Sequence, residues 1–186
     1  LMHIYLIEAG PRLLAGMSEE SSAHAEQFLR EMGVNILLNK RVVDYRDHKV
    51  VLEDGTEIAT RTFIWVSGVT GVTIGNLDAS LIGRGGRIKV DSFNRVEGMN
   101  NVFAIGDQCI QVADEDYPNG HPQLAQVAIQ QGELLAKNLV RMEKGREMKP
   151  FHYRNLGSMA TVGRNRAVAE FSKVKMQGWF AWVMWL

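Results

Sequence analysis

Apolar residues in the first third of the chain form short runs and one helical pattern. Residues 4–7 are an apolar run that ends at Glu8 and a Gly-Pro turn, which predicts a buried parallel strand. Ser18 then precedes two glutamates, and apolar positions recur every three or four residues up to Gly33, which predicts an amphipathic helix. Short strands should follow, with a hairpin turn at residues 54–55, over residues 34–38, 42–45, 49–52 and 57–59. A strand, a helix and a strand meander predict an α/β fold.

The middle of the chain combines short apolar runs with glycine-rich stretches. Residues 63–66 are apolar and precede Ser67 and Gly68, so they predict another buried strand. Six glycines lie between residues 71 and 98, a composition typical of a linker between domains, with a short strand at residues 87–90.

A candidate ligand-binding turn lies at Gly106 and Asp107, after a predicted buried strand at residues 102–105. A glycine there lets a ligand come close, and an aspartate offers hydrogen-bond acceptors to a hydroxyl group. Taken alone, the pair is better explained by a turn and a helix cap. A polar loop that contains Asp114, Glu115 and Asp116 follows and is expected at the surface, and His121 is placed in this loop because the sequence shows no partner for it.

A second helix is predicted from Pro122, since proline is tolerated in a first helical turn. Gln126 and Gln130 lie one turn apart and should face the same cleft, although glutamines on a helix often serve solubility alone. The apolar positions at helical spacing predict its buried face, namely Leu124, Val127, Ala128, Leu134, Leu135 and Leu139.

The end of the chain predicts short strands and an aromatic segment. Strands are expected at residues 151–153, 157–163 and 164–171, and residues 178–186 contain three tryptophans among apolar residues. That segment is shorter than the ~18 apolar residues of a spanning helix. It suits either a membrane interface, with Lys173 and Lys175 nearby, or a core whose partner is missing. Because the chain begins and ends inside apolar runs, we expect a piece of a longer protein, cut at both ends.

Composition narrows the picture further. The chain has 186 residues and a formal net charge of zero, so nothing indicates a nucleic-acid partner, and the length suits one domain or two small ones. The single cysteine, Cys109, cannot form an internal disulfide and is expected to be a small packed residue. No metal site is predicted.

The turn at Gly106 and Asp107, together with residues 122–132 (Pro-Gln-Leu-Ala-Gln-Val-Ala-Ile-Gln-Gln-Gly), resembles the flavin-binding return of flavoprotein reductases with two dinucleotide-binding domains. Among these, it is most similar to the type II NADH:quinone oxidoreductases. The resemblance implies a partial, Rossmann-like α/β fold. Residues 1–86 would belong to an NAD(H)-binding domain with a strand meander, residues 87–147 to the return segment of an FAD domain, and residues 148–186 to the start of a membrane-associating region.

The resemblance also implies a function. The parent enzyme would pass a hydride from NADH to FAD and electrons onward to a membrane quinone, bound peripherally at the cytoplasmic face of the cell membrane, with a homodimer among its expected states. Gly106 and Asp107 would hold the ribityl chain of FAD. Ala125 and Gln126 would face the flavin ring near the quinone, with Gln130 as a further contact.

Two other positions are candidates for binding NADH. An acidic residue that ends the second strand of a dinucleotide-binding unit accepts hydrogen bonds from the adenosine ribose, and its charge disfavours a 2′-phosphate, so Glu8 indicates NADH; a surface acid is the equal alternative. By resemblance, Ser67 and Gly68 would pass beside the nicotinamide ring, although a purely structural turn fits them nearly as well.

Two other functions stay open from the sequence. The parent could be another flavoprotein reductase of the same superfamily, acting on ferredoxin or a disulfide, or a non-catalytic binding module that kept the fold. The chain contains no Gly-x-Gly-x-x-Gly phosphate loop. The 186 residues by themselves are therefore expected neither to hold FAD tightly nor to turn over.

Overall fold

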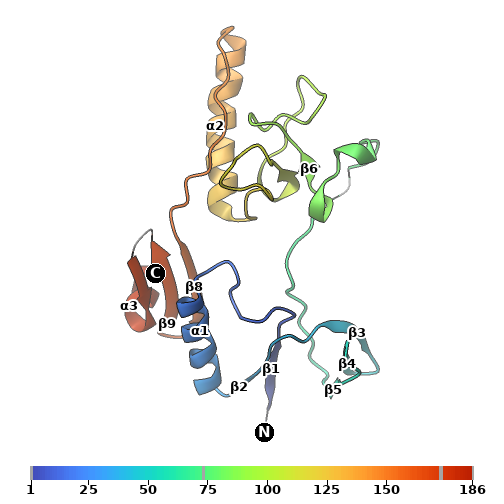
Figure 1. Cartoon of the computed structure of the whole chain (residues 1–186), viewed down its shortest axis with the longest axis vertical. Helices are drawn as coiled ribbons and strands as arrows, with labels where there is room; N and C mark the ends of the chain where they lie inside the picture. Colours follow the sequence, from blue (N-terminus) through green and yellow to red (C-terminus); the bar gives the residue numbers. More distant parts are fainter. Residues whose placement is uncertain (1, 73, 172–173, 186) are drawn as a thin grey trace. The chain divides into compact units, whose positions relative to one another are not determined.

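A computed structural model describes residues 2–72, 74–171 and 174–185. The chain divides into two compact units (Figure 1). The first unit contains Leu1–Trp65 and Leu156–Leu186, and the second contains Val66–Asn155.

The first unit opens with a strand, a helix and a second, parallel strand. β1 (Ile4–Ile7) pairs with β2 (Val34–Leu37), and α1 (Glu19–Glu31) connects them. The side chain of Ser18 caps α1 by accepting a hydrogen bond from the Ser21 N–H, as the sequence predicts. The strand expected at residues 34–38 thus belongs to the parallel pair and not to the meander, because it returns beside β1 after a crossover helix.

The predicted meander is confirmed as a separate antiparallel sheet. Its strands are β3 (Val42–Arg46), β4 (Lys49–Leu52) and β5 (Glu57–Ala59), in that spatial order. The hairpin turn between β4 and β5 has Gly55 at φ +83°, a conformation that favours glycine.

The last part of the chain returns to the first unit as a sheet and a helix. β8 (Ser158–Gly163), β9 (Arg166–Phe171) and β10 (Val174–Gln177) form an antiparallel sheet with β9 in the middle, and α3 (Gly178–Trp185) packs on it. The contact consists of small residues with no exposed surface, Ala167, Ala169 and Ala181, so the helix and strand approach closely. β8 and β9 confirm two predicted strands, and β10 was not predicted.

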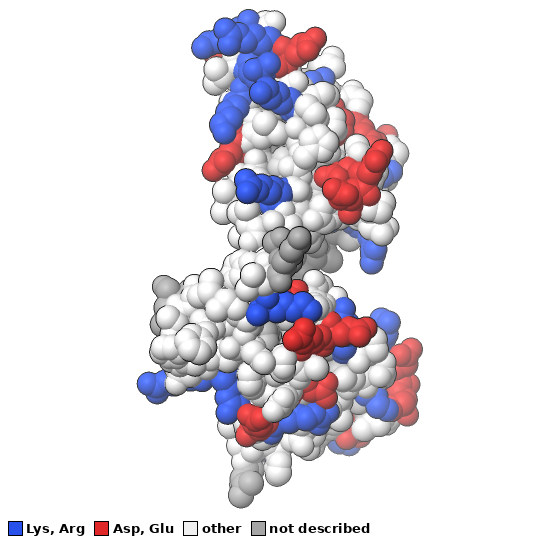
Figure 2. Space-filling view, turned by 60° about the vertical axis from the view of Figure 1, so that its left-hand side comes forward, with Lys and Arg blue, Asp and Glu red and all other residues white. Residues whose placement is uncertain are grey.

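Most large side chains of α3 are exposed. They include Trp179, Phe180, Val183 and Met184. Figure 2 shows a largely uncharged, white area on the left of the lower half of the view, with charged side chains beside it. Within the part of the chain that the structure describes, no helix has the length and apolarity needed to cross a membrane. The small residue Ala181 is buried. α3 therefore contributes one face to a core and leaves an apolar face exposed.

The second unit is built around α2 (Ala125–Glu143) and a short parallel pair, β6 (Ile88–Lys89) and β7 (Cys109–Ile110). Three 3-10 turns complete it, η1 (Ala79–Leu81), η2 (Arg84–Gly86) and η3 (Gly106–Gln108). One apolar cluster lies around the strand pair, and a second joins α2 to Phe151 and Tyr153.

Three predicted strands do not form. Residues 63–66 make no strand, and Ile64 and Val66 are 74% and 84% exposed. The backbone of residues 102–105 hydrogen-bonds to the irregular segment around residues 94–96 and forms one isolated bridge with it. Residues 151–153 form no ladder, although Phe151 is buried. An apolar run becomes a strand only where a neighbouring strand accepts its ladder, and the described backbone supplies none at these positions.

The prediction for the second helix was partly wrong. α2 begins at Ala125, and Pro122 lies before it. Among the predicted buried positions, Leu124 and Leu139 are exposed, whereas the polar Gln131 and Asn138 are buried. These two amides turn inward because each bonds the backbone of another segment, which outweighs their preference for water.

Candidate functional site

The turn at Gly106 and Asp107 lies directly against α2. Gly106 has φ +66°, and its N–H donates to the side-chain oxygen of Gln131 at 2.7 Å. A Cβ at this glycine would stand 3.3 Å from the Cβ of Ala128, closer than such atoms usually approach. The turn is therefore packed tightly on the helix, and the side chain of Asp107 is left exposed beside it.

The start of α2 offers hydrogen-bond donors at the same place. Leu124 is the N-cap residue and provides no side-chain hydrogen bond to the first turn, whose N–H groups carry partial positive charge. The Gln123 side chain donates to the backbone carbonyl of Asp107 at 3.2 Å, which joins the helix start to the turn. The structure thus brings together Gly106, Asp107 and the helix start that contains Ala125.

The two candidate glutamines differ in their surroundings. The Gln130 amide donates to the Arg154 carbonyl at 2.9 Å and accepts from the Arg154 N–H at 3.0 Å. Both functional groups of Gln130 therefore hold the chain that follows Tyr153. Gln126 is half-buried in the first turn of α2, on the element that packs against η3.

The candidate NADH residues lie in different units. Glu8 follows β1, and its carboxylate accepts a hydrogen bond from the Gly10 N–H at 2.7 Å. Ser67 and Gly68 belong to the second unit, where the strand predicted before them is absent. No common site is described for these residues.

A buried pair that sequence reasoning missed lies between β7 and α2. The Nε2 atom of His121 is 3.0 Å from Oδ2 of Asp114, and the two side chains are 1% and 7% exposed. The hydrogen bond with His121 is the main reason that the pKa of Asp114 lies below its ordinary value. The expectation of a surface acid and an unpartnered loop histidine was wrong, because aromatic rings pack around His121 and Asp114 is buried beside it. The only signal in the sequence was the concentration of rings at Tyr117, Phe151 and Tyr153.

Arg87 is a second residue that sequence reasoning missed. Its Nε donates to the Cys109 carbonyl at 2.6 Å and its Nη2 to the His121 carbonyl at 3.1 Å. Burial lowers the pKa of this guanidinium. Cys109 is buried, which confirms its predicted packing role. Its neighbours Asn94 and Gln131 offer only weak sulfur contacts at 3.7–3.9 Å.

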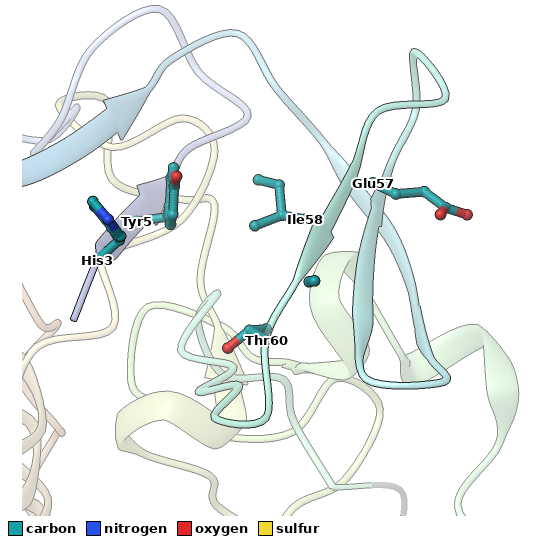
Figure 3. A pocket seen from close by; sticks show the side chains of 6 residues that line it. His3, Tyr5, Glu57, Ile58 and Thr60 are labelled. Atoms are coloured by element: carbon teal, nitrogen blue, oxygen red, sulfur yellow. The ribbon is translucent and has the colours of Figure 1, made fainter. Parts of the chain in front are cut away.

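Each unit has a hollow on its surface. A depression of about 430 Å³ lies between β1 and β5, and Figure 3 shows Ile58 pointing toward Tyr5 while Glu57 points away. A second, of about 300 Å³, is lined by α2 and residues 150–152. Among the described residues, no group of three His, Cys, Asp or Glu side chains is placed to hold a metal ion.

Comparison with known proteins gives these features a context. The chain is 35% identical, over 98% of its length, to the type II NADH:quinone oxidoreductase NdhA of Mycobacterium tuberculosis, and it covers 40% of that protein. It is 33% identical, over 99% of its length, to the internal alternative NAD(P)H-ubiquinone oxidoreductase A1 of Arabidopsis thaliana mitochondria, and it covers 39% of that protein. The chain therefore spans about 40% of the length of the curated relatives it matches.

Solved structures share the fold at lower sequence identity. NDH2 from Plasmodium falciparum, solved in complex with NADH, matches 99% of this chain and 53% of its own with a TM-score of 0.85 at 19% identity. The sulfide:quinone oxidoreductase of Aquifex aeolicus matches 97% of this chain and 47% of its own with a TM-score of 0.74 at 15% identity. The predicted fold class, part of a Rossmann-like flavoprotein reductase, is confirmed.

A family model described as pyridine nucleotide-disulphide oxidoreductase matches residues 2–132, a stretch that includes β1, the meander, the Asp107 turn and the start of α2. On this match and the shared fold, the chain belongs to the pyridine nucleotide-disulphide oxidoreductase family.

Proposed function

We propose that this chain is part of a type II NADH:quinone oxidoreductase whose FAD lies against the Asp107 turn and the start of α2. One observation carries the proposal. An exposed carboxylate, a tightly packed glycine turn and a helix start without a side-chain cap lie together, joined by the bond from Gln123 to the Asp107 carbonyl. The relative that is 35% identical is named a type II NADH:quinone oxidoreductase, and the one that is 33% identical is named an internal alternative NAD(P)H-ubiquinone oxidoreductase.

The residues of this turn fit the flavin cofactor. The carboxylate of Asp107 is an acceptor for ribityl hydroxyls, and Gly106 lets the backbone turn without a side chain in the way. The N–H groups at the start of α2 would stabilise negative charge at the pyrimidine edge of the flavin ring. When bound, FAD supplies the acceptance of a hydride from NADH and the delivery of electrons to a quinone.

The quinone contact is assigned to Gln126. Its amide can donate to a quinone carbonyl, and its neighbour Ala125 is small enough to leave room for a ring. Gln130 stays a weaker candidate, since both groups of its amide hold the Arg154 backbone.

The remaining assignments follow the family. Residues 1–86 would complete an NAD(H)-binding domain in which Glu8 accepts hydrogen bonds from the adenosine ribose, with Ser67 and Gly68 beside the nicotinamide. Residues 87–147 would return to the FAD domain, and residues 148–186 would begin the membrane-associating region. The open apolar face of α3 supports peripheral attachment, which we place at the cytoplasmic face of the membrane. A homodimer belongs to the same proposal.

The test uses the intact protein. It should purify with the absorption of oxidised flavin and oxidise NADH faster with a water-soluble quinone than with a disulfide or ferredoxin. Asp107→Ala should lose most of the flavin, because the acceptor for the ribityl hydroxyls is gone, whereas Asp116→Ala, an exposed aspartate of the nearby loop, should keep it. A protein without flavin would support a binding module instead, and a preference for the disulfide would support another reductase of the family. The 186 residues alone should bind FAD weakly and show no turnover, since they lack a phosphate loop.

A further inference from the structure

The loop between β7 and α2 is held by a buried pair whose role extends to the proposed flavin site. The Asp114 carboxylate accepts hydrogen bonds from His121 Nε2 at 3.0 Å and from the Asp116 N–H at 3.1 Å. It also accepts a hydrogen bond from the backbone N–H of Tyr153. A buried carboxylate with three donors is satisfied, and removing its side-chain donor leaves a charge less well compensated.

The imidazole ring of His121 is enclosed by three aromatic rings. The Phe151 ring meets it edge to face at 5.2 Å between centroids, the Tyr153 ring lies at 5.9 Å, and the Tyr117 ring at 5.2 Å. His121 Nδ1 is buried and has no hydrogen-bond partner among the described residues. Close packing restricts the rotamers of a buried side chain, so the enclosed ring restrains the backbone of His121.

One guanidinium closes the same loop at both ends. Arg87 donates to the carbonyl of Cys109, in β7 before the loop, and to the carbonyl of His121, near the end of the loop. The two residues after His121 are Pro122, whose φ is restricted, and Gln123, whose side chain donates to the Asp107 carbonyl. The contacts form a continuous path from Asp114 through His121 and Gln123 to the turn that carries Asp107.

We propose that His121 and Asp114 are positioning residues that set the start of α2 against the Asp107 turn, and thereby the affinity and environment of the flavin. This inference rests on the proposed function for its flavin readout. Neither side chain is exposed enough to touch a cofactor, so both act through the backbone at residues 121–123.

The decisive variant in the intact protein is His121→Phe, which keeps an aromatic ring in the cluster and removes the donor to Asp114. The Kd for FAD should rise about tenfold, and the visible absorption band of the bound flavin should shift. His121→Gln should recover the affinity to within about threefold, because its amide nitrogen can reach the position of Nε2. His152→Phe is the control. It replaces an exposed histidine that lies between Phe151 and Tyr153 in the sequence, and it should match the wild type.

A second measurement needs no flavin. Hydrogen exchange in His121→Phe should accelerate about fivefold or more at the amides of Gly106, Val127 and Ala128, with no change in the C-terminal half of α2. Equal acceleration along the whole helix would show general destabilisation and would overturn the inference. If the wild type binds no FAD, the proposed function fails and hydrogen exchange alone decides the positioning role.

If His121→Phe does not fold, Gln123→Met tests the same path, because it removes the bond to the Asp107 carbonyl and leaves the buried pair intact. It should weaken FAD binding to a similar extent. Wild-type affinity in Gln123→Met, or equal affinities in wild type, His121→Phe and His121→Gln, would overturn the inference.

Discussion

The side-chain oxygen of Gln131 accepts a 2.7 Å hydrogen bond from the backbone N–H of Gly106. Gln131 is fully buried on α2, seven residues after Leu124, the N-cap. A polar residue on the buried face of the helix therefore holds the turn that carries Asp107. The contact explains why an amide occupies a position where apolar periodicity would place a leucine.

Replacing Gln131 with methionine should destabilise the second unit. The change keeps the side-chain length but leaves the Gly106 N–H without its acceptor, at a cost of about 1–3 kcal/mol. Urea unfolding of both proteins measures the difference. Gln27→Met, at an exposed position of α1, is the matched control and should cost less than about 0.5 kcal/mol. Equal effects of the two changes would show that the buried bond adds nothing.

Alanine at Gly106 should destabilise the protein, whereas alanine at Gly132 should not. Gly106 has φ +66° and its new Cβ would crowd Ala128, so Gly106→Ala should destabilise by about 1–2 kcal/mol. Gly132 lies inside α2, where a Cβ would make ordinary contact with Ile105 at 3.7 Å, so Gly132→Ala should be neutral or stabilise by up to about 1 kcal/mol. Thermal unfolding of the two variants tests the contrast, and a stable Gly106→Ala protein would contradict the observed turn.

Glu170 should make the first unit sensitive to acid. Its carboxylate, on β9, accepts a hydrogen bond from the Ser18 N–H at 2.9 Å. This bond holds the start of α1 against β9. Burial raises the pKa of Glu170, but hydrogen bonds from Ser18 and Ser21 together outweigh it and leave the pKa lowered. A lowered folded pKa stabilises the protein above the unfolded value of about 4.3, and this stabilisation is lost as the pH falls through the folded pKa.

Unfolding free energies of wild type and Glu170→Gln, measured across this range, should differ most above about pH 5 and converge as the pH falls below about 4. Glu53→Gln removes an exposed carboxylate of the meander and should leave the pH dependence unchanged. A constant difference at all pH values would refute the role of the Glu170 charge.

Cys109 should react slowly with alkylating reagents in the folded protein. Burial raises the pKa of its thiol, and contact with Gln131 only partly offsets this, so little reactive thiolate forms. Mass spectrometry of the Cys109 peptide after iodoacetamide treatment should show protection in buffer and full labelling in urea. Rapid labelling without denaturant would mean that the strand pair opens readily.

Much of the fold could be predicted from local signals in the sequence. The capped helix after Ser18 and the hairpin turn at Gly55 were predictable because their signals lie within a few residues. The turn at Gly106 and the residues of α2 were enough to indicate the family, since these segments carry a recurrent local pattern.

Only the tertiary structure decided which apolar runs became strands and which polar groups were buried. Residues 63–66 read as a strand, yet no described neighbour pairs with them, and α2 buries Gln131 and Asn138 because distant backbone groups need their amides. His121 and Asp114 are seven residues apart, but Phe151 and Tyr153, some thirty residues further along, exclude water from the pair. A ladder partner or the burial of a hydrogen-bonded pair depends on groups remote in the sequence, and no local pattern specifies where those groups will lie.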